Sequence, residues 1–386
     1  MGPYRLRDHA RMFGSHTRNR AYAAALDRVV AAGDVVLDIG TGTGLLAMLA
    51  CKAGAARVYA VESSPIIAYA RTLAARNGFE DRITFIEQSS LTLTLPERVD
   101  VIVSDVRGVL PLAANALTTL IDARERFLRP GGRMVPARDV VCGAVVSAAG
   151  VYRDFIDVWK RSESGIDASP IRRSATQQIT PVDADDLDVL TDVVQWTTID
   201  YLTCPTTSGS GRLHWQVGQD IETSHGFALW FEARLVDGIS YRTGPGTSDD
   251  LYGAAFFPWP ERLTCTAGTV IDVDLRADLV AGSYVWTWRT ELMTDGQRRS
   301  FEQSTFAGGP LSSGSLQAQA PDQQPQVGLE AAVDAEALKL LCRGLKLGEA
   351  GARLHQAFPA RFVDDVEATS HVADLATRYR ARRDDP

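Results

Sequence analysis

VVLDIGTGTGLLAMLA, residues 35–50, is the stretch that decides the fold of this chain. Its apolar, β-branched start predicts a buried strand, and its Leu- and Ala-rich end predicts a helix. Between them Gly40, Gly42 and Gly44 form the kind of turn that lets the backbone approach a ligand closely. Leu45 stands where the dinucleotide fingerprint G-x-G-x-x-G requires its third glycine. The stretch therefore predicts a ligand site at a strand end, for a ligand other than a dinucleotide.

Predicted strands and helices alternate on both sides of this stretch. Strands are expected at 56–63, 83–88 and 99–105, and helices at 18–32, 64–78 and 115–128. This alternation predicts a doubly wound α/β domain with a mostly parallel sheet. After residue 138, runs of alternating apolar and polar residues between Gly, Asp and Ser turns predict an antiparallel β barrel or sandwich.

The predicted organisation has five segments along the chain. We expect N-terminal lid helices in 1–30, a Rossmann-like cofactor domain in 31–137, a β domain in 138–306 with an inserted arm at 151–180, a linker in 307–328 and a small helical module in 329–386. The linker is expected from its Gly, Ser, Pro and Gln content.

Two carboxylates in register with the glycines indicate the nature of the ligand. Asp38 ends the first predicted strand, where a carboxylate would repel a pyrophosphate and suits a cationic group such as an α-amino group or a sulfonium. Glu62 ends the next strand, where it can accept hydrogen bonds from both hydroxyls of a ribose. The pattern predicts S-adenosylmethionine, rather than NAD, as the cofactor.

The N-terminal segment HARMFGSHTRNRAY carries a second motif. With His9, Met12, Arg18 and Tyr22 it matches an H-x-x-M…R-x-x-x-Y pattern, and it resembles the protein arginine methyltransferase family of class I S-adenosylmethionine-dependent methyltransferases. LLAMLACKAGAARVYAVESS and LRPGGRMVP resemble the same family. The resemblance implies a seven-strand-type methyltransferase domain, then a β domain whose inserted segment is a dimerisation arm, with S-adenosylhomocysteine as the product.

In this family the N-terminal helix folds over the cofactor. The resemblance therefore implies that Met12 touches the cofactor and that Arg18 pairs with its carboxylate, a task for which a guanidinium is also physically suited. The residues expected at the cofactor are Met12, Arg18, Asp38, Gly40, Thr41, Gly42, Gly44, Leu45, Glu62, Ser63, Gln88, Ser89, Ser90 and Ser104.

The loop SDVRGVLPLAANAL, residues 104–117, departs from the family pattern. The family uses two glutamates in this loop to grip a guanidinium, and the matching positions are Asp105 and Ala114. A Thr-His-Trp loop of the β domain is altered as well, because its His and Trp positions fall on Ala254 and Ala255. Both halves of a guanidinium site are therefore changed.

Methyl transfer requires only an aligned nucleophile and the removal of a proton, so these changes are expected to alter the acceptor without abolishing the reaction. Asp105 is a candidate proton acceptor for an amine, and Arg107 a candidate partner for an acceptor carboxylate. Tyr4 and His9 on the lid complete the candidate catalytic residues.

The sequence leaves three functions open. The first is methylation of an amine or carboxylate of a ribosomal peptide natural product or a related metabolite. The second is N-methylation of a small molecule or an arginine by an atypical site, and the third is a silent scaffold that binds cofactor or peptide. The segment 338–379 weakly resembles the winged-helix PqqD-like modules that bind peptides, which implies a peptide partner.

Composition narrows the range of partners. A net charge of −8 disfavours nucleic acid, and the absence of a long apolar run disfavours a membrane span. The five cysteines are scattered without a CxxC pair, which predicts neither a disulfide framework nor a metal site. We expect a cytoplasmic homodimer that acts on a peptide or a small molecule.

Overall fold

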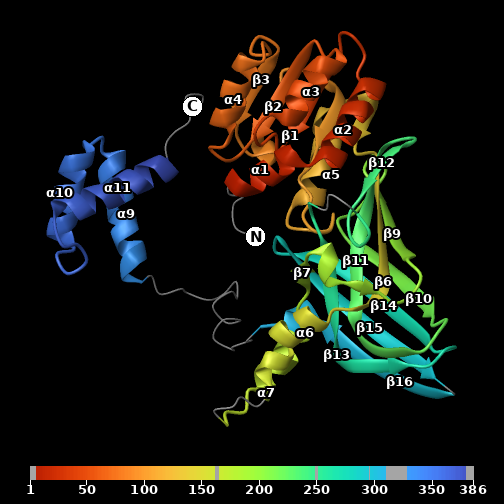
Figure 1. The fold of residues 1–386 in the computed structure, drawn as a ribbon. Coiled ribbons are helices and arrows are strands. Elements are labelled where there is room, and N and C mark those ends of the chain that lie inside the picture. The colour runs from red at the N-terminus through yellow and green to blue at the C-terminus, as the bar shows by residue number, and fades with distance from the viewer. Residues whose placement is uncertain (1–5, 161–164, 248–250, 295, 310–327, 380–386) are drawn as a thin grey trace. The chain divides into compact units, whose positions relative to one another are not determined.

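The computed structural model describes residues 6–160, 165–247, 251–294, 296–309 and 328–379. They form two compact units, 1–310 and 311–386. The first unit contains the lid helices, the cofactor domain and the β domain, and the second contains the helical module (Figure 1). Most of the predicted linker, 310–327, lies outside the described residues.

The cofactor domain has the predicted alternation of strands and helices. Its parallel sheet has the order β3-β2-β1-β4-β5. The strands are β1 (Val35–Ile39), β2 (Arg57–Glu62), β3 (Ile83–Glu87), β4 (Val99–Ser104) and β5 (Leu128–Val135), and the helices are α1 (Leu6–Gly14), α2 (His16–Val29), α3 (Leu45–Ala53), α4 (Ile67–Arg76) and α5 (Ala116–Phe127), with a 3-10 turn η1 (Ser90–Thr92). This confirms the predicted doubly wound α/β domain.

The parallel sheet places the ligand loops at one edge. β1 lies between β2 and β4, and the order of the strands reverses on its two sides, so the loops after β1, β2 and β4 meet where doubly wound sheets bind ligands. All six residues of β4 are buried, as an apolar central strand requires. The sheet has five strands rather than the seven of the predicted type, because β5 is followed after Pro136 and Ala137 by the first strand of the β domain.

The β domain confirms the predicted antiparallel architecture. It consists of a seven-stranded sheet, with the path β7-β13-β11-β6-β8 plus β12 on β11 and β9 on β6, and a four-stranded sheet β10-β14-β15-β16. The strands are β6 (Arg138–Ser147), β7 (Thr180–Val182), β8 (Asp188–Val189), β9 (Val194–Asp200), β10 (Gly209–Gln216), β11 (Ile221–Val236), β12 (Ile239–Arg242), β13 (Ala254–Cys265), β14 (Val270–Val280), β15 (Ser283–Thr294) and β16 (Gln297–Ser304).

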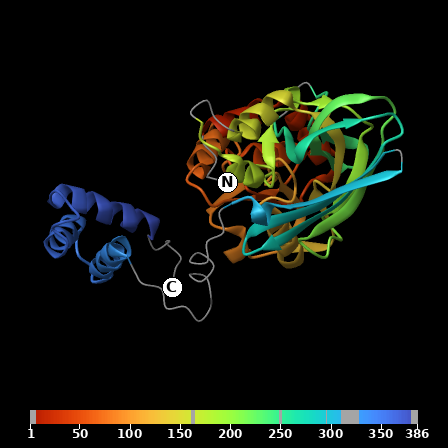
Figure 2. The same cartoon turned by 90° about the horizontal axis from the view of Figure 1, so that it is seen from below.

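The strands of the two sheets lie next to one another in the β domain (Figures 1 and 2). Aromatic side chains fill the space between the two sheets. Phe227 of β11 stacks on Phe257 of β13 at 4.6 Å, and Phe257 meets the ring of Trp288 on β15 edge-on at 5.3 Å. Such ring pairs add to the free energy gained from burial alone. The two sheets therefore share one core.

The segment predicted as an inserted arm is mostly helical. It contains α6 (Ala149–Phe155), η2 (Asp157–Trp159) and α7 (Ser169–Ala175), and it returns to the sheet through β7; a further turn, η3 (Ala184–Asp186), follows. Residues 161–164 lie outside the described part of the arm. Phe155 and Ile171 expose about half of their surface, 55% and 48%. Figure 1 shows α7 projecting from the body of the β domain.

The second unit is a three-helix module. α9 (Leu329–Cys342), α10 (Leu347–Ala357) and α11 (Asp365–Arg378) enclose a core of their own, which includes Val333, Leu354 and Val372. Gly351 lets α10 approach α11, since an added Cβ would lie 2.6 Å from the Cα of Thr369. Within residues 328–379 there is no strand, so the wing of a PqqD-like module is missing from the described part of this unit. A helical module was predicted, and its role in peptide binding stays a prediction.

Candidate active site

The glycine loop between β1 and α3 forms one wall of the site. Gly40, Gly42 and Gly44 have φ values of 72°, 54° and 82°, in the left-handed region that favours glycine. A Cβ on Gly42 would lie 3.2 Å from the ring of His9 on the lid, so the missing side chain keeps space open between loop and lid. The hydroxyl of Ser104 donates to the Ile39 carbonyl at 2.8 Å and ties the end of β4 to the end of β1.

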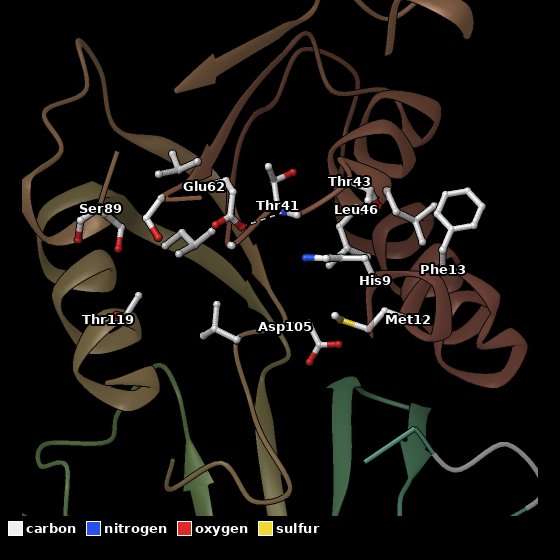
Figure 3. A pocket seen from close by; sticks show the side chains of 18 of the residues that line it. His9, Met12, Phe13, Thr41, Thr43, Leu46, Glu62, Ser89, Asp105 and Thr119 are labelled. Carbon is white, nitrogen blue, oxygen red and sulfur yellow. Dashed lines mark hydrogen bonds between the residues drawn. The ribbon is translucent and has the colours of Figure 1, made fainter. Parts of the chain in front are cut away.

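A cavity of about 290 Å³ lies between this loop and the lid (Figure 3). In Figure 3, His9 and Met12 point into it from the lid, Glu62 borders it beside the glycine loop, and Ser89 and Thr119 lie on the side opposite the lid. Its lining consists of His9, Met12, Phe13, Arg18, Ile39, Gly40, Thr41, Gly42, Thr43, Leu45, Leu46, Val61, Glu62, Ser63, Gln88, Ser89, Ser90, Asp105, Val106 and Thr119.

Glu62, the last residue of β2, is oriented by backbone donors. The Gly42 N–H donates to its Oε2 at 3.2 Å and the Ser64 N–H donates to its Oε1 at 2.9 Å. Each carboxylate oxygen can accept a second hydrogen bond, because an ionised carboxylate has about four acceptor sites. Glu62 can therefore accept two hydroxyl groups of a ligand in the cavity.

Asp38 has a different position from the one expected of a group that faces the ligand. It is wholly buried and does not line the cavity. Its Oδ2 accepts from the Thr41 hydroxyl at 2.6 Å, and the Ala47 N–H in the first turn of α3 also favours its charged form. Burial outweighs these contacts and raises the pKa of Asp38 to about 7. Asp38 therefore stabilises the glycine loop through Thr41 and the first turn of α3, and it does not face the ligand.

Arg18 extends from α2 into the lower part of the cavity, where Asp105 also lies. Only 7% of its side chain is exposed. Its Nε donates to Asp105 Oδ2 and its Nη1 donates to Asn19 Oδ1 at 2.6 Å, while its Nη2 has no hydrogen-bond partner among the described residues. The guanidinium thus keeps one terminal nitrogen for a ligand anion.

Asp105 follows β4 and lies in a buried network of charges. Besides Arg18, its Oδ2 accepts from the Tyr252 hydroxyl at 2.6 Å, and its Oδ1 accepts from Arg107 Nε at 3.1 Å and Nη2 at 2.9 Å. Burial alone would raise the pKa of Asp105, but the two guanidiniums outweigh it and lower the pKa to about 2. A carboxylate so strongly ionised and so fully bonded is a poor proton acceptor.

Arg107 was expected to face an acceptor carboxylate, but in the structure its side chain points away from the cofactor cavity and into the protein interior. Its side chain is 1% exposed and does not line the cavity. Its Nη1 donates to Asp139 Oδ1 at 2.6 Å, and its Nη2 donates to the hydroxyls of Tyr22 and Tyr241 at 2.7 Å each. These partners come from both domains, so Arg107 is a buried link between them.

The other expected residues fall into three groups. Most of the predicted cofactor residues line the cavity, and so does His9. Asp38, Gly44 and Ser104 adjoin the cavity without lining it, and Tyr4 lies outside the described residues. Phe13, Ile39, Thr43, Leu46, Val61, Val106 and Thr119 line the cavity and were not predicted. All of these except Thr119 are next to a predicted residue in sequence, so side-chain direction separated them from the predicted set. Thr119 lies on α5, where no site residue was predicted.

The positions that depart from the family pattern, Ala114, Ala254 and Ala255, do not form a second binding group for a guanidinium beside Asp105. Ala114 is exposed, with a φ of 43°. Ala254 and Ala255 lie in β13 and are buried, and Ala255 borders an apolar cavity of about 360 Å³ together with Leu112 and Trp286. Asp105 is thus the carboxylate that the loop after β4 offers near the cofactor cavity.

The residues of the cavity fit S-adenosylmethionine. The glycine loop leaves room that a Cβ would fill, Glu62 can accept two ribose hydroxyls, and the Nη2 of Arg18 can donate to a carboxylate. Apolar side chains such as Leu46 and Val61 provide surface for a flat base. These are the chemical parts of that cofactor.

Comparisons with known proteins agree with this fit. The family model of the ribosomal protein L11 methyltransferase (PrmA) matches residues 13–137. The chain is 29% identical over 248 residues to a probable protein arginine N-methyltransferase 6 from Arabidopsis thaliana, covering 62% of this chain and 55% of that protein. The chain spans about half to two thirds of the length of such plant relatives.

A bacterial relative and two solved structures extend the likeness. The chain is 31% identical over 274 residues to an arginine N(omega)-methyltransferase from Streptomyces achromogenes subsp. streptozoticus, covering 69% of this chain and 75% of that protein. Its fold is similar to a chain of the Trypanosoma brucei PRMT1 enzyme–prozyme complex with AdoHcy (TM-score 0.70, 23% identity, 77% of this chain and 96% of that chain). It is also similar to Arabidopsis thaliana protein arginine methyltransferase 10 (TM-score 0.65, 22% identity, 77% and 96%).

No helix in the described ranges is long and apolar enough to cross a membrane. The cofactor cavity, the order of the domains and the extent of the match to the Streptomyces protein lead to one assignment. The chain belongs to the arginine N-methyltransferase family of S-adenosylmethionine-dependent methyltransferases.

Proposed function

We propose that this protein methylates an amine of a peptide natural product or a related metabolite, with S-adenosylmethionine as the methyl donor. When bound, the cofactor supplies a methyl group that is already activated by its sulfonium. The residues of this chain hold the cofactor and bring the acceptor beside it. The amine loses its proton to solvent water before its nitrogen attacks the methyl group, and the sulfonium leaves as a neutral thioether. The observation that carries the proposal is the state of Asp105, which has no free acceptor site for a guanidinium.

A second cavity, of about 460 Å³, supports an amine as the acceptor. It borders the cofactor cavity at Met12. The charged groups on its wall are Asp8, Asp183, Asp186 and Arg11, and the rest of the lining includes Val109, Val151, Phe155, Val182, Leu251 and Tyr252. With three carboxylates and one guanidinium, the wall of this cavity favours a cationic group over an anionic one. The apolar side chains favour an apolar substituent next to that group.

An arginine-type acceptor is the alternative with a specific observation in its favour. The Streptomyces relative, whose name states that it methylates arginine, matches this chain over 75% of its own length. Against it stand the bonded state of Asp105 and the exposed Ala114 in place of the family's second glutamate. A carboxylate acceptor, which needs no base, is disfavoured by the acidic wall of the second cavity.

Transfer of a radiolabelled methyl group to three matched probes tests the proposal. Phenethylamine, phenethylguanidine and 3-phenylpropanoate share one apolar group and differ in the reacting end. We expect label on phenethylamine only, in a form that resists mild alkali, because an N-methyl group is stable there and a methyl ester is not. Label confined to the guanidine, or label released by alkali, would contradict the proposal. Cofactor binding without transfer to any amine or peptide would favour the scaffold.

The Asp183→Asn/Asp186→Asn double variant should weaken acceptor binding. Removing two carboxylates from the cavity wall lowers its attraction for a cation, so we expect KM for phenethylamine to rise about tenfold while kcat changes little. Asp185→Asn is the matched control, because Asp185 lies between the two on the same turn and does not line the cavity. Equal effects of both variants, measured as initial rates, would remove the support that this cavity gives to an amine.

The peptide part of the proposal rests on the helical module. Val363, just before α11, and Val366, in the first turn of α11, are 88% and 75% exposed, which is unusual for neighbouring apolar side chains and provides a surface for a peptide. A chain that ends at residue 310 should keep its KM for phenethylamine and raise its KM for a peptide acceptor.

We also propose that the protein forms a homodimer through the arm. Phe155, Val158 and Ile171 of the arm are half exposed, as are Phe13 of the lid and Tyr69 of the cofactor domain. Exposed apolar groups of this kind gain free energy when a second copy covers them. Sedimentation equilibrium measures the mass, and a monomer at micromolar concentration would exclude this arrangement.

A further inference from the structure

The chain itself satisfies the carboxylate of Asp105. Oδ1 accepts from two nitrogens of Arg107, and Oδ2 accepts from Arg18 and from Tyr252. With about four acceptor sites on a carboxylate, these four donors leave none for a ligand. Arg107 binds Asp105 as the guanidinium of an acceptor would bind a carboxylate, but here the guanidinium belongs to the protein itself.

Arg107 is fixed from the side of the β domain. Asp139 on β6 pairs with its Nη1 at 2.6 Å, and Tyr201 donates to the other oxygen of Asp139 at 2.6 Å. The ring of Phe231 on β11 lies 5.1 Å from the centre of the guanidinium. Because a forked, fully bonded guanidinium loses little freedom per bond, it is a rigid support for whatever it holds.

We infer that Arg107 is a positioning and specificity-determining residue: it occupies Asp105 from within the chain, thereby orienting Arg18 toward the cofactor and closing Asp105 to an acceptor guanidinium. Arg18 donates its Nε to Asp105 and has its Nη2 left for the cavity. If Asp105 were free to turn, Arg18 would lose the contact that fixes its direction.

The charges of the cluster agree with this role. Two guanidiniums, Arg18 and Arg107, face two carboxylates, Asp105 and Asp139, so the cluster as a whole has no net charge. A cationic acceptor gains no attraction from a neutral, fully bonded cluster, and finds it instead in the second cavity. The inference rests on the proposed function in taking the first cavity as the cofactor site.

Binding of S-adenosylhomocysteine to the full chain, measured by calorimetry, tests the inference. We expect Arg107→Ala to raise the Kd about tenfold, the size of one weakened charge-assisted hydrogen bond. Guanidinium ion at millimolar concentration, far below denaturing levels, should restore most of the affinity of this variant by filling the vacated place. It should leave the wild-type Kd unchanged, and methylammonium at the same concentration should restore nothing.

Two further variants separate positioning from a purely structural role. Arg107→Met/Asp139→Asn removes one charge of each sign, which avoids an unpaired buried charge and keeps the test open if Arg107→Ala does not fold. Arg124→Ala is the control, because Arg124 is also largely buried but donates to the carbonyls of Tyr201 and Cys204 instead of Asp105. It should lose stability and keep its affinity.

The outcomes are distinguishable. A folded Arg107 variant that binds S-adenosylhomocysteine as tightly as the wild type overturns the inference, and so does guanidinium that tightens binding to the wild type. A wild-type chain that binds no S-adenosylhomocysteine overturns the proposed function and, with it, the inference. Rescue by guanidinium supports the inference even where phenethylamine is not methylated.

Discussion

Replacing Asp139 with alanine lowers the free energy of unfolding by about 3–5 kcal/mol, as expected when one partner of a buried ion pair is removed. Asp139 is completely buried, and it accepts from Arg107 and from the Tyr201 hydroxyl at 2.6 Å each. Without it, Arg107 keeps its charge in the interior and loses the stronger of its acidic contacts. Urea denaturation followed by tryptophan fluorescence measures the change.

Asp274→Ala is the matched control for this prediction. Asp274 accepts two hydrogen bonds from Arg212, at 2.8 and 2.9 Å, but both side chains are at least half exposed. Exposed pairs contribute about 0–1 kcal/mol, so this variant should unfold close to the wild type. If the two variants lose the same stability, the buried cluster does not hold the domains together in the way described.

Gly42→Ala reduces the affinity for S-adenosylhomocysteine by about 10- to 100-fold, the equivalent of about 1.4–3 kcal/mol of crowding. The added methyl group would lie 3.2 Å from the His9 ring, in space that the lid and the loop leave for a ligand. It would also strain a backbone whose φ is 54°. Calorimetric titration of the folded variant measures the affinity.

Strain and crowding are separated by Gly33→Ala. Gly33 also has a positive φ, 97°, but nothing lies within 4 Å of an added Cβ, and it is remote from the cavity. Both variants should lose about 1–2 kcal/mol of stability from the left-handed conformation, and only Gly42→Ala should lose affinity. Weak binding by both, or by neither, would mean that the glycine loop does not border the cofactor.

The cofactor half of the molecule could be predicted because its signals are local. Gly40, Gly42 and Gly44 follow a strand directly, and Glu62 ends the next one, so sequence spacing alone brings them to one edge of the sheet. The direction in which each side chain points could not be predicted as well from the sequence. Asp38 was expected to face the ligand, yet the turn from β1 into α3 points it down onto Thr41 and the helix.

The acceptor side could not be predicted because its partners are distant in sequence. Arg107 meets Asp139 across 32 residues and Tyr241 across 134. One signal was available: Arg107 lies in a mostly apolar loop and Asp139 near the start of a mostly apolar strand, and opposite charges in buried segments are expected to pair. In the tail, helical periodicity predicted the helices. It carries no information on whether a strand-built wing is present, and within residues 328–379 there is no strand.

The buried cluster also determines where this protein can be cut. Architecture changes at residue 138, but Arg107 on one side of that point donates hydrogen bonds to Asp139 and Tyr241 on the other. A fragment that stops at 137 would carry a buried Arg107 without Asp139 and an Asp105 without Tyr252. For expression, domain exchange or reconstitution from fragments, the smallest sensible unit is the whole of residues 1–310, while the three-helix module can be removed or transplanted by itself.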